Sequence, residues 1–388
     1  MKRVYLDHAA TTPTDPRVVE AMLPFFTESF GNPSSIHSLG QESKEAMEDA
    51  RTTVAGLIGA RSEEIVFTSG GTEADNYALK GIAYAKESVG NHIITTTVEH
   101  HAIMETCQFL EKHGFQVTTV PVDKYGVVDP IEIEKAITDK TILISVMLAN
   151  NEIGTIEPIA EIARIAKERE ICIHTDAVQA IGHIPVDVNE LNVDLLSLSA
   201  HKLYGPKGIG ALYVRKGIKL ANLLHGGGQE RGRRGSTENV AGIVGLGKAV
   251  EIAKDAISED MKHSINLRDE LTQGLIERID DIHLNGHPTH RLPNNVNLSI
   301  HYVEGESMLL NLDLEGIAAS TGSACSSGNL EPSHVLLALG LSHEQAHGSL
   351  RFTLGRDTEK DDVMRVLNTL PSIVSKLRAM SPLAKAKS

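Results

Sequence analysis

Lys202 and Asp176 are the two residues whose types and spacing could do chemistry on an aldehyde cofactor. Lys202 follows a short apolar run and precedes a Gly-Pro turn, in the stretch SLSAHKLYGPKG at residues 197–208. A desolvated lysine loses its proton and becomes a nucleophile that can hold an aldehyde as a Schiff base. Because most lysines are exposed, this stretch alone favours a surface lysine at a β-turn.

Asp176 ends the apolar stretch ICIHTD at residues 171–176, which predicts a buried strand with an acid at its carboxyl end. Open α/β sheets bind ligands at that end of their strands. Pyridoxal phosphate needs a carboxylate beside its pyridinium nitrogen, so that the ring can act as an electron sink. Upstream, TSGGTEADN at residues 68–76 is a glycine turn that leads into a helix, and a helix amino terminus binds phosphate. In this order the three features indicate a pyridoxal phosphate enzyme.

The composition limits the class of protein. A chain of 388 residues can bury a large core and has the length of two or three domain-sized pieces. With 37 Lys and Arg against 51 Asp and Glu, the net charge of −14 argues against nucleic acid or an anionic membrane as a partner. No apolar run reaches transmembrane length, and the first residues lack the apolar core of a secretion signal. Three cysteines make no disulfide framework, so we expect a cytoplasmic protein.

From residue 64 onward, strand-like and helix-like segments alternate, which is typical of a mostly parallel sheet with helices on both faces. We expect seven strands near residues 65–68, 92–96, 116–120, 141–147, 171–175, 195–199 and 210–214. We expect helices between them near residues 73–86, 102–113, 131–137 and 159–170. A tight glycine turn precedes the last strand, which predicts that this strand runs antiparallel.

The flanking segments complete an α/β fold with two domains. Helices are predicted at residues 16–28 and 41–59, and a long helix at about 240–279 leads to strands near 295–299 and 350–353. We therefore expect a large domain at residues 13–255, with a seven-stranded sheet between helices. A smaller α+β domain is expected from residues 1–12 and 256–380. The tail at 381–388 is expected to be disordered.

Seven ordered motifs resemble those of the NifS/IscS-type cysteine desulfurases, a class V branch of the fold type I pyridoxal phosphate enzymes. They are YLDHAATT (5–12), GNPSS (31–35), TVEHHA (97–102), NNEIG (150–154), the lysine stretch, STGSACSSG (320–328) and LRFTLGR (350–356). Seven motifs in order are far more specific than one short pattern. The cysteine motif is similar to the NifS/IscS branch and lacks the Gly-His-His-Cys pattern of the SufS branch.

The resemblance implies roles around pyridoxal 5'-phosphate. Lys202 would hold the cofactor as a Schiff base and move the α-proton of the substrate, while His100 would stack on the ring and assist proton transfer. Asp176 would pair with the pyridinium nitrogen, and Gln179 would hydrogen-bond the phenolic oxygen. The residues expected at the phosphate are Gly71, Thr72, Ser199 and His201, with Thr237 reaching in from a second subunit. The cross-subunit role of Thr237 implies a homodimer.

The resemblance also implies the substrate and the reaction. Arg351 would bind the carboxylate of L-cysteine through a bidentate fork, which lysine could not reproduce. Asn151 would contact both cofactor and carboxylate, with Asn32 as a helper. Cys325 would attack the sulfur of the bound cysteine, leaving an enzyme persulfide and L-alanine. The persulfide sulfur would pass to an iron–sulfur scaffold protein or to a tRNA-thiolation partner. With a scaffold protein, Cys325 would also share in ligating the cluster.

The other cysteines and the histidines have structural interpretations. Small polar residues flank Cys325, as an exposed reactive thiolate requires. Cys172 lies between isoleucines and Cys107 lies mid-helix, so we expect both in the core. His100 and His101 are adjacent and cannot share a face as metal ligands, so no metal site is expected.

Two positions depart from the family pattern, and three alternatives to the desulfurase stay open. Ala200 stands where the family often has glycine before His-Lys, and Ser236 precedes Thr237 as a possible substitute for it. A selenocysteine lyase could share every residue named above, whereas a class V aminotransferase would not need Cys325. A non-catalytic scaffold is disfavoured because Lys202 and Asp176 are intact.

Overall fold

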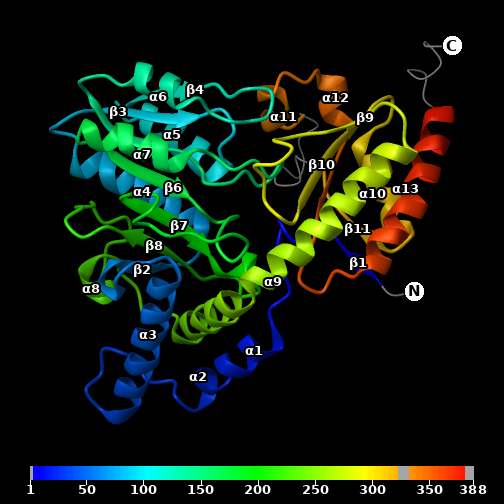
Figure 1. Ribbon diagram of the computed structural model, residues 1–388. Coiled ribbons are helices and arrows are strands. Elements are labelled where there is room, and N and C mark those ends of the chain that lie inside the picture. Colours follow the sequence, from blue (N-terminus) through cyan, green and yellow to red (C-terminus); the bar gives the residue numbers. More distant parts are fainter. Residues whose placement is uncertain (1–2, 322–331, 381–388) are drawn as a thin grey trace.

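The larger lobe is built on one seven-stranded sheet. The computed structural model describes residues 3–321 and 332–380 (Figure 1). The strand order is β2-β8-β7-β6-β5-β3-β4. The strands are β2 (Ile65–Thr68), β3 (His92–Thr96), β4 (Gln116–Val120), β5 (Thr141–Ser145), β6 (Cys172–Asp176), β7 (Leu195–Ser199) and β8 (Gly210–Val214). β8 runs antiparallel to both of its neighbours, β2 and β7, which confirms the prediction for the last strand.

Helices pack on both faces of this sheet, as the alternation predicts. On one face, α4 (Gly71–Ala85) and α5 (His101–Glu111) bury an apolar cluster that includes Tyr77 and Ile103. On the other face, α6 (Pro130–Ala136) and α7 (Ile159–Glu168) contribute Ile133 and Ile162 to a second cluster. Two short 3-10 turns, η1 (Ser62–Glu64) and η2 (Ala200–Lys202), flank β2 and β7. The sheet therefore presents the carboxyl ends of its parallel strands along one edge.

The segment before the sheet differs from the predicted helix at residues 16–28. It forms two short helices, α1 (Pro16–Met22) and α2 (Pro24–Thr27), because Pro24 has no N–H to continue α1. The next helix, α3 (Ser38–Leu57), begins three residues earlier than predicted. Its amino terminus is capped by His37, whose Nδ1 accepts from the Gly40 N–H at 3.3 Å.

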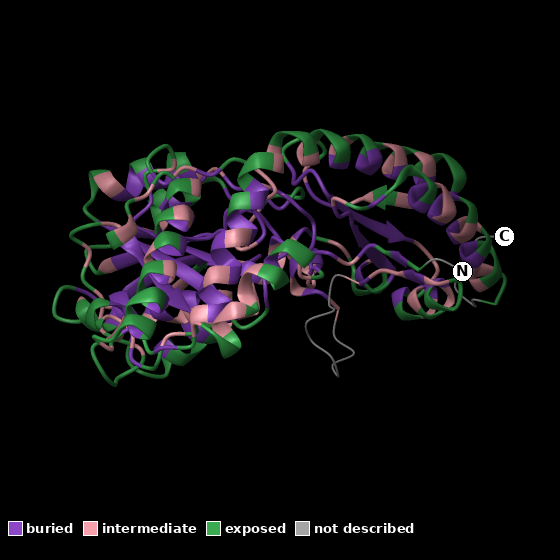
Figure 2. Cartoon of the chain, turned by 90° about the horizontal axis from the view of Figure 1, so that it is seen from below, coloured by how far each residue is buried: buried purple, intermediate pink, exposed green. Residues whose placement is uncertain are grey.

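The smaller lobe has its own sheet and its own core. Its sheet order is β12-β10-β9, all antiparallel, and β1 pairs with β11 in a separate parallel pair. These strands are β1 (Val4–Tyr5), β9 (Ile282–Leu284), β10 (Asn295–Ile300), β11 (Ile317–Ala318) and β12 (Ser349–Thr353). The helices are α10 (Gly305–Leu314), α11 (His334–Ala338), α12 (His343–His347) and α13 (Lys360–Met380). Figure 2 shows buried strands inside both lobes and exposed helix faces around them.

One continuous helix, α9 (Val240–Arg278), joins the two lobes. Ile243 and Leu246 near its start belong to the core of the larger lobe, whereas Leu267 and Leu271 belong to that of the smaller lobe. The predicted domain boundary at residues 255/256 falls inside this helix and stays a prediction. Among the described residues, no helix has the length and apolarity needed to span a membrane.

Candidate active site

A cavity of about 240 Å³ lies at the carboxyl ends of β6 and β7, where residues from both lobes meet. The predicted site residues that line it are Gly71, Thr72, His100, Asn151, Asp176, Gln179, Ser199, His201, Lys202 and Arg351. The cavity is also lined by residues to which the sequence analysis assigned no role: Ala9, Ala10, Asp75, Met147 and Val178. One wall is the segment that follows β1, so the start of the chain closes the site.

Lys202 enters the cavity from η2, directly after β7. It is half-buried, whereas the sequence analysis expected an amine removed from water. Its Nζ donates to the Ala9 carbonyl, and to the Ala10 carbonyl at 2.9 Å. Its own carbonyl accepts from His183 Nε2 at 3.2 Å. The lysine is thus held at both ends, by the start of the chain and by the loop after β6.

Asp176 is buried at the end of β6, and its Oδ1 accepts from the Val178 N–H at 2.9 Å. Burial raises the pKa of this carboxyl to about 6, against the lowering effects of the Val178 hydrogen bond and of Lys202. Two further buried acids lie behind it. Burial raises the pKa of Glu99 to about 8, and burial and the charge of Asp176 hold the pKa of Asp75 well above its usual range. Three neighbouring buried carboxyls repel one another when charged, so they cannot all ionise. Asp176 is the one most favoured to ionise, because the Val178 N–H and Lys202 lower its pKa.

Asp75 lies in the first turns of α4, next to a buried histidine. Its Oδ1 has no hydrogen-bond partner within the described residues and lies 3.7 Å from His174 Nε2. His174 is held between Ser145 Oγ at 2.9 Å and Ser197 Oγ at 3.0 Å, and burial lowers its pKa to about 3. This neutral imidazole therefore brings no positive charge to Asp75.

The phosphate-binding side of the cavity is formed by the glycine turn before α4. Gly70 has φ of +151°, and a Cβ added to Gly71 would lie 2.7 Å from Val178 Cγ2, so the turn requires glycine at both positions. The first N–H groups of α4 have no partner within the helix. A second, more open cavity of about 350 Å³ adjoins the first and shares Gly71, Thr72, Ser199 and His201 with it.

Two histidines line the cavity in neutral form. His100 is the N-cap of α5, where its Nδ1 accepts from the Ala102 N–H at 3.1 Å. Burial, and after it the charge of Lys202, lowers the pKa of His100 to about 4. The pKa of His201 is lowered to about 4 by the same two effects, and its Nδ1 lies 3.1 Å from Thr11 Oγ1. Both imidazoles are uncharged near neutral pH, so each can stack on a ring without adding charge.

Arg351 reaches the cavity from β12 of the smaller lobe and is almost fully buried. Its NH1 donates to the Asn151 carbonyl at 2.9 Å, and its NH2 pairs with Asp7 Oδ1 at 3.0 Å. Its Nε is buried and has no hydrogen bond within the described residues. A buried guanidinium with an unused N–H is suited to a carboxylate ligand.

Three predicted residues do not line this cavity. Asn32 is exposed and its Oδ1 accepts from the Ser34 N–H at 2.9 Å. Thr237 is also exposed. Cys325 lies outside the described residues. Gln179 does line the cavity, but its Nε2 already donates to the Ala9 carbonyl at 3.0 Å.

The loop that leads to Thr237 is held against α3 and α4 by ion pairs. Arg234 forms a fork with Glu73 in α4, at 2.8 and 3.1 Å, and Glu73 also accepts from the Ser69 N–H. In α8 (Gln229–Gly232), buried Glu230 pairs with buried Arg51 of α3 at 2.7 Å. Glu230 has a left-handed backbone with φ of +48°. This conformation costs free energy, so the ion pair with Arg51 and the surrounding fold must stabilise it.

The donor set fits pyridoxal phosphate. The lysine amine suits an aldehyde, the Asp176 carboxylate suits a protonated ring nitrogen, and the α4 amino terminus with its glycine turn suits a phosphate. Most of the residues that the sequence predicts to bind the cofactor therefore line one cavity whose chemistry suits it. Cys107 and Cys172 are buried, as predicted.

Comparisons with known proteins give consistent matches. A model of the class-V aminotransferase family matches residues 4–366. The cysteine desulfurase IscS of Methanosarcina thermophila is 61% identical over 382 residues, which are 98% of this chain and 94% of that protein. The cysteine desulfurase IscS of Clostridium botulinum is 59% identical over 384 residues, or 98% and 97% of the two chains. A solved NifS-like protein superposes with a TM-score of 0.92 at 42% identity, covering 97% of this chain and 100% of that one.

Proposed function

The chain belongs to the class-V aminotransferase family, among its NifS/IscS-type cysteine desulfurases, and from this we propose how its residues act on L-cysteine. It is a pyridoxal phosphate-dependent cysteine desulfurase that converts L-cysteine to L-alanine. The observation that supports the residue roles best is the convergence of Lys202, Asp176 and Arg351 on one cavity of about 240 Å³. These three groups match the aldehyde, the ring nitrogen and the substrate carboxylate.

The larger lobe supplies the residues that hold the cofactor. Lys202 would bind its aldehyde carbon, Asp176 would pair with its ring nitrogen, and His100 would stack on its ring. Gly71, Thr72, Ser199 and His201 would hold its phosphate, and Gln179 would hydrogen-bond its phenolic oxygen. When bound, pyridoxal phosphate supplies an electron sink for the bonds at the substrate Cα.

Proton transfer at the substrate is assigned to Lys202. The carbonyls of Ala9 and Ala10 orient its amine, so that Nζ takes the proton from Cα and later returns one. His100 is neutral, because its pKa is lowered to about 4, so it is a weak base that assists proton transfer only beside Lys202. Asn151 and Arg351 fix the carboxylate and so set which Cα bond faces the lysine.

Sulfur transfer is assigned to Cys325. Its thiolate attacks the substrate sulfur, so that a new S–S bond forms as the Cβ–S bond breaks. The electron pair of the broken bond stays on the carbon skeleton and is protonated, which gives L-alanine and leaves the persulfide on Cys325. Only the thiolate is nucleophilic, so the step requires deprotonated Cys325.

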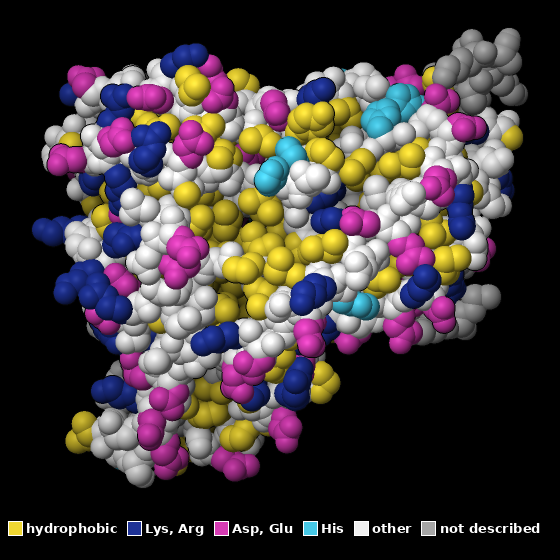
Figure 3. Space-filling model, viewed as in Figure 1, with side chains coloured by type: hydrophobic (Ala, Val, Ile, Leu, Met, Phe, Trp, Pro, Cys, Tyr) yellow, Lys and Arg dark blue, Asp and Glu magenta, His cyan; other side chains and the backbone are white. Residues whose placement is uncertain are grey.

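We further propose a homodimer. Thr237 is exposed and does not line the cavity of its own subunit, as expected for a residue that completes the site of a second copy. The segment from α1 to the start of α3 also exposes several large apolar side chains, and hydrophobic surface is visible over these helices in Figure 3. They are Leu23, Phe26, Phe30 and Ile36, with 58%, 61%, 64% and 96% of their surface exposed. Apolar surface on this scale is typical of an interface.

The sulfur acceptor and the location are also proposals. An iron–sulfur scaffold or another sulfur acceptor is the proposed recipient of the persulfide sulfur. A cytoplasmic location is supported by cysteine usage, since Cys107 and Cys172 are buried free thiols.

The test is a visible spectrum of the purified protein before and after addition of L-cysteine, with alanine and protein-bound sulfur measured in the same sample. We expect a yellow protein that forms one alanine per sulfur, and a mass gain of one sulfur atom on Cys325. Cys325→Ser should keep the colour and lose both products, whereas Cys107→Ala, the matched control, should keep them. A Cys325→Ser variant with undiminished desulfuration would overturn the sulfur-transfer role.

A further inference from the structure

Arg356 links the smaller lobe to the segment that carries Lys202. It lies five residues after Arg351 along the chain, just beyond β12. Its guanidinium carbon lies 4.0 Å from the centre of the Tyr204 ring, a cation–π contact. Its backbone N–H donates to the Tyr204 hydroxyl at 2.8 Å. Because Tyr204 is two residues after Lys202, this contact joins the proposed carboxylate-binding strand to the lysine turn.

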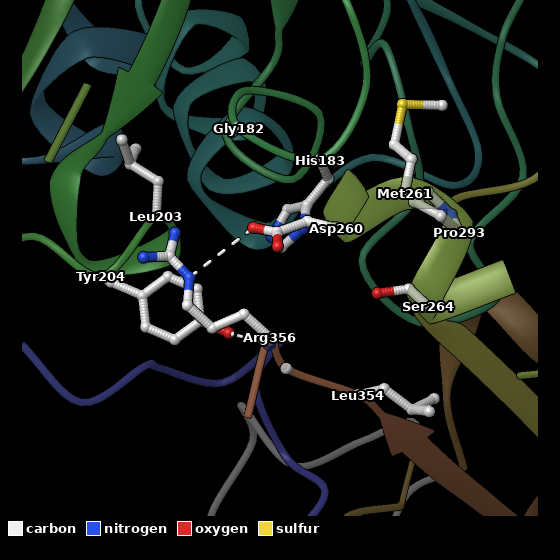
Figure 4. A pocket seen from close by; sticks show the side chains of 11 residues that line it. Gly182, His183, Leu203, Tyr204, Asp260, Met261, Ser264, Pro293, Leu354 and Arg356 are labelled. Atoms are coloured by element: carbon white, nitrogen blue, oxygen red, sulfur yellow. Dashed lines mark hydrogen bonds and ion pairs between the residues drawn. The ribbon is translucent and has the colours of Figure 1, made fainter. Parts of the chain in front are cut away.

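The same guanidinium forms ion pairs with two other segments. NH1 lies 3.2 Å from Asp15 Oδ2 at the start of α1, and Nε lies 3.7 Å from Asp260 Oδ2 in α9. Figure 4 shows Arg356 between Tyr204 and Asp260, with His183 behind them. Only 15% of the Arg356 side chain is exposed, so solvent screens these charges weakly. Four separate segments therefore meet at one side chain.

The lysine turn needs such support. Tyr204 has φ of +63°, a left-handed conformation that costs a bulky residue free energy unless its surroundings hold it. Its N–H donates to Thr12 Oγ1 at 2.9 Å, and its carbonyl accepts from the Asp15 N–H at 2.9 Å. Arg356 holds both the ring of Tyr204 and the side chain of Asp15.

Little space is left behind Lys202. The cavity between His183, Tyr204, Asp260 and Arg356 has a volume of about 10 Å³, barely enough to hold one water molecule. A Cβ added to Gly355, the residue before Arg356, would lie 2.6 Å from the Tyr204 hydroxyl oxygen. Close packing of this kind transmits displacements of one lobe to the other.

We propose that Arg356 is a positioning residue that sets the distance between Lys202 and Arg351, and with it the fit of the substrate carboxylate. The proposal rests on the roles of these two residues in the proposed function. Arg356 itself lines the small cavity behind the site and is not among the described residues that line the substrate cavity. Its loss should therefore weaken the binding of L-cysteine more than that of the cofactor, whose contacts come from the larger lobe.

The experiment compares Arg356→Gln with Arg278→Gln in the full-length holoenzyme. Arg278 is the control, since it is an exposed arginine whose bonds to Leu367 and Asn368 stay within the smaller lobe. We expect Arg356→Gln to raise the KM for L-cysteine about tenfold, as a lost charged contact of about 1.4 kcal/mol would. The cofactor Kd should stay within about twofold of wild type, because the contacts of Arg356 with Asp15, Tyr204 and Asp260 lie outside the cofactor site. Arg356→Lys, which keeps the charge but not the planar group, should give an intermediate KM.

A second measurement separates this proposal from the proposed function. In the apoprotein, hydrogen exchange of the Tyr204 and Asp15 amides should be faster in Arg356→Gln than in Arg278→Gln. The positioning role would be overturned if Arg356→Gln kept both the wild-type KM for L-cysteine and the wild-type exchange protection. It would also be overturned if the variant lost cofactor while its remaining holoenzyme kept the wild-type KM. A wild-type protein that releases no alanine would instead overturn the proposed function. The exchange comparison would still show whether Arg356 stabilises the segments of Tyr204 and Asp15.

Discussion

Arg351 NH2 and Asp7 Oδ1 form an ion pair of 3.0 Å at the wall of the cavity. The guanidinium proposed to receive the substrate carboxylate is thus already beside one carboxylate, which comes from the other end of the chain. Asp7 orients Arg351 but also weakens the positive potential that attracts an anionic ligand. The two effects can be separated by substitution.

Asp7→Asn should lower the KM for L-cysteine about threefold, because it removes the competing charge and keeps an oxygen acceptor for NH2. Asp7→Ala should raise the KM, because the guanidinium also loses its orienting partner. Steady-state kinetics of the two variants check this prediction. Equal changes in KM for both would mean that Asp7 acts by charge alone.

Lys202→Ala should lose cofactor absorbance on dialysis and lower kcat by at least about a thousandfold, because both the covalent attachment and the proton carrier are removed. The control is Lys219→Ala, at an exposed lysine. Absorbance spectra before and after dialysis, with alanine release, provide the measurement. Retention of the bound-cofactor spectrum in Lys202→Ala would rule out this lysine as the attachment point.

Glu99→Gln should flatten the pH dependence of stability in the apoprotein. Burial raises the Glu99 pKa from 4.5 to about 8, so the folded state holds this proton at pH values where the unfolded state has released it. Its contribution is therefore fully present below pH 4.5 and is lost as pH rises toward 8, by at most about 1.4 kcal/mol per pH unit.

Urea unfolding across that pH range measures the effect, with Glu111→Gln as the control at an exposed glutamate. The Glu99→Gln curve should fall less steeply with pH than both wild type and control. Parallel curves for all three proteins would show that Glu99 is ionised in the folded state.

Thr237 can be tested in mixed dimers that contain one live site. When a Lys202→Ala, Thr237→Val subunit is paired with a wild-type subunit, the cofactor affinity of the live site should fall about tenfold, through a lost hydrogen bond to phosphate. When Lys202→Ala and Thr237→Val lie in different subunits, the live site receives an intact Thr237 and should bind normally. The same pairs made with Ser236→Ala show whether the neighbouring hydroxyl acts instead.

Much of the fold follows from local patterns in the sequence. The seven predicted strands of the large sheet lie within two residues of the observed ones, because apolar runs alternate with helical periodicity there, and the antiparallel β8 follows from its glycine turn. The short strands β9 and β11 were not predicted. Helix ends were less predictable, as at α3, because a histidine side chain caps it. Proline at position 24 breaks the first helix, a signal that the sequence does contain.

The sequence motifs predicted individual residues of the site, but they did not predict the contacts between residues far apart in the chain. The Arg351–Asp7 pair joins residues 344 positions apart, and Arg356 meets Tyr204 across 152 positions. Such contacts depend on how the two lobes pack, which no local pattern records. Asp75 carries a weak signal, since it follows the glycine turn by one helical turn and so can face the same cavity.

The length of α9 restricts how the two lobes could be exchanged between related proteins. The helix has 39 residues and is therefore about 58 Å long. Ala253 is the last residue of α9 in the core of the larger lobe, and Leu267 is the first in the core of the smaller lobe. One inserted or deleted residue between them would rotate the second group of core residues by about 100° and turn it away from its core. A chimaera joined within α9 must therefore preserve the residue count between these two positions, whereas loops elsewhere tolerate changes of length.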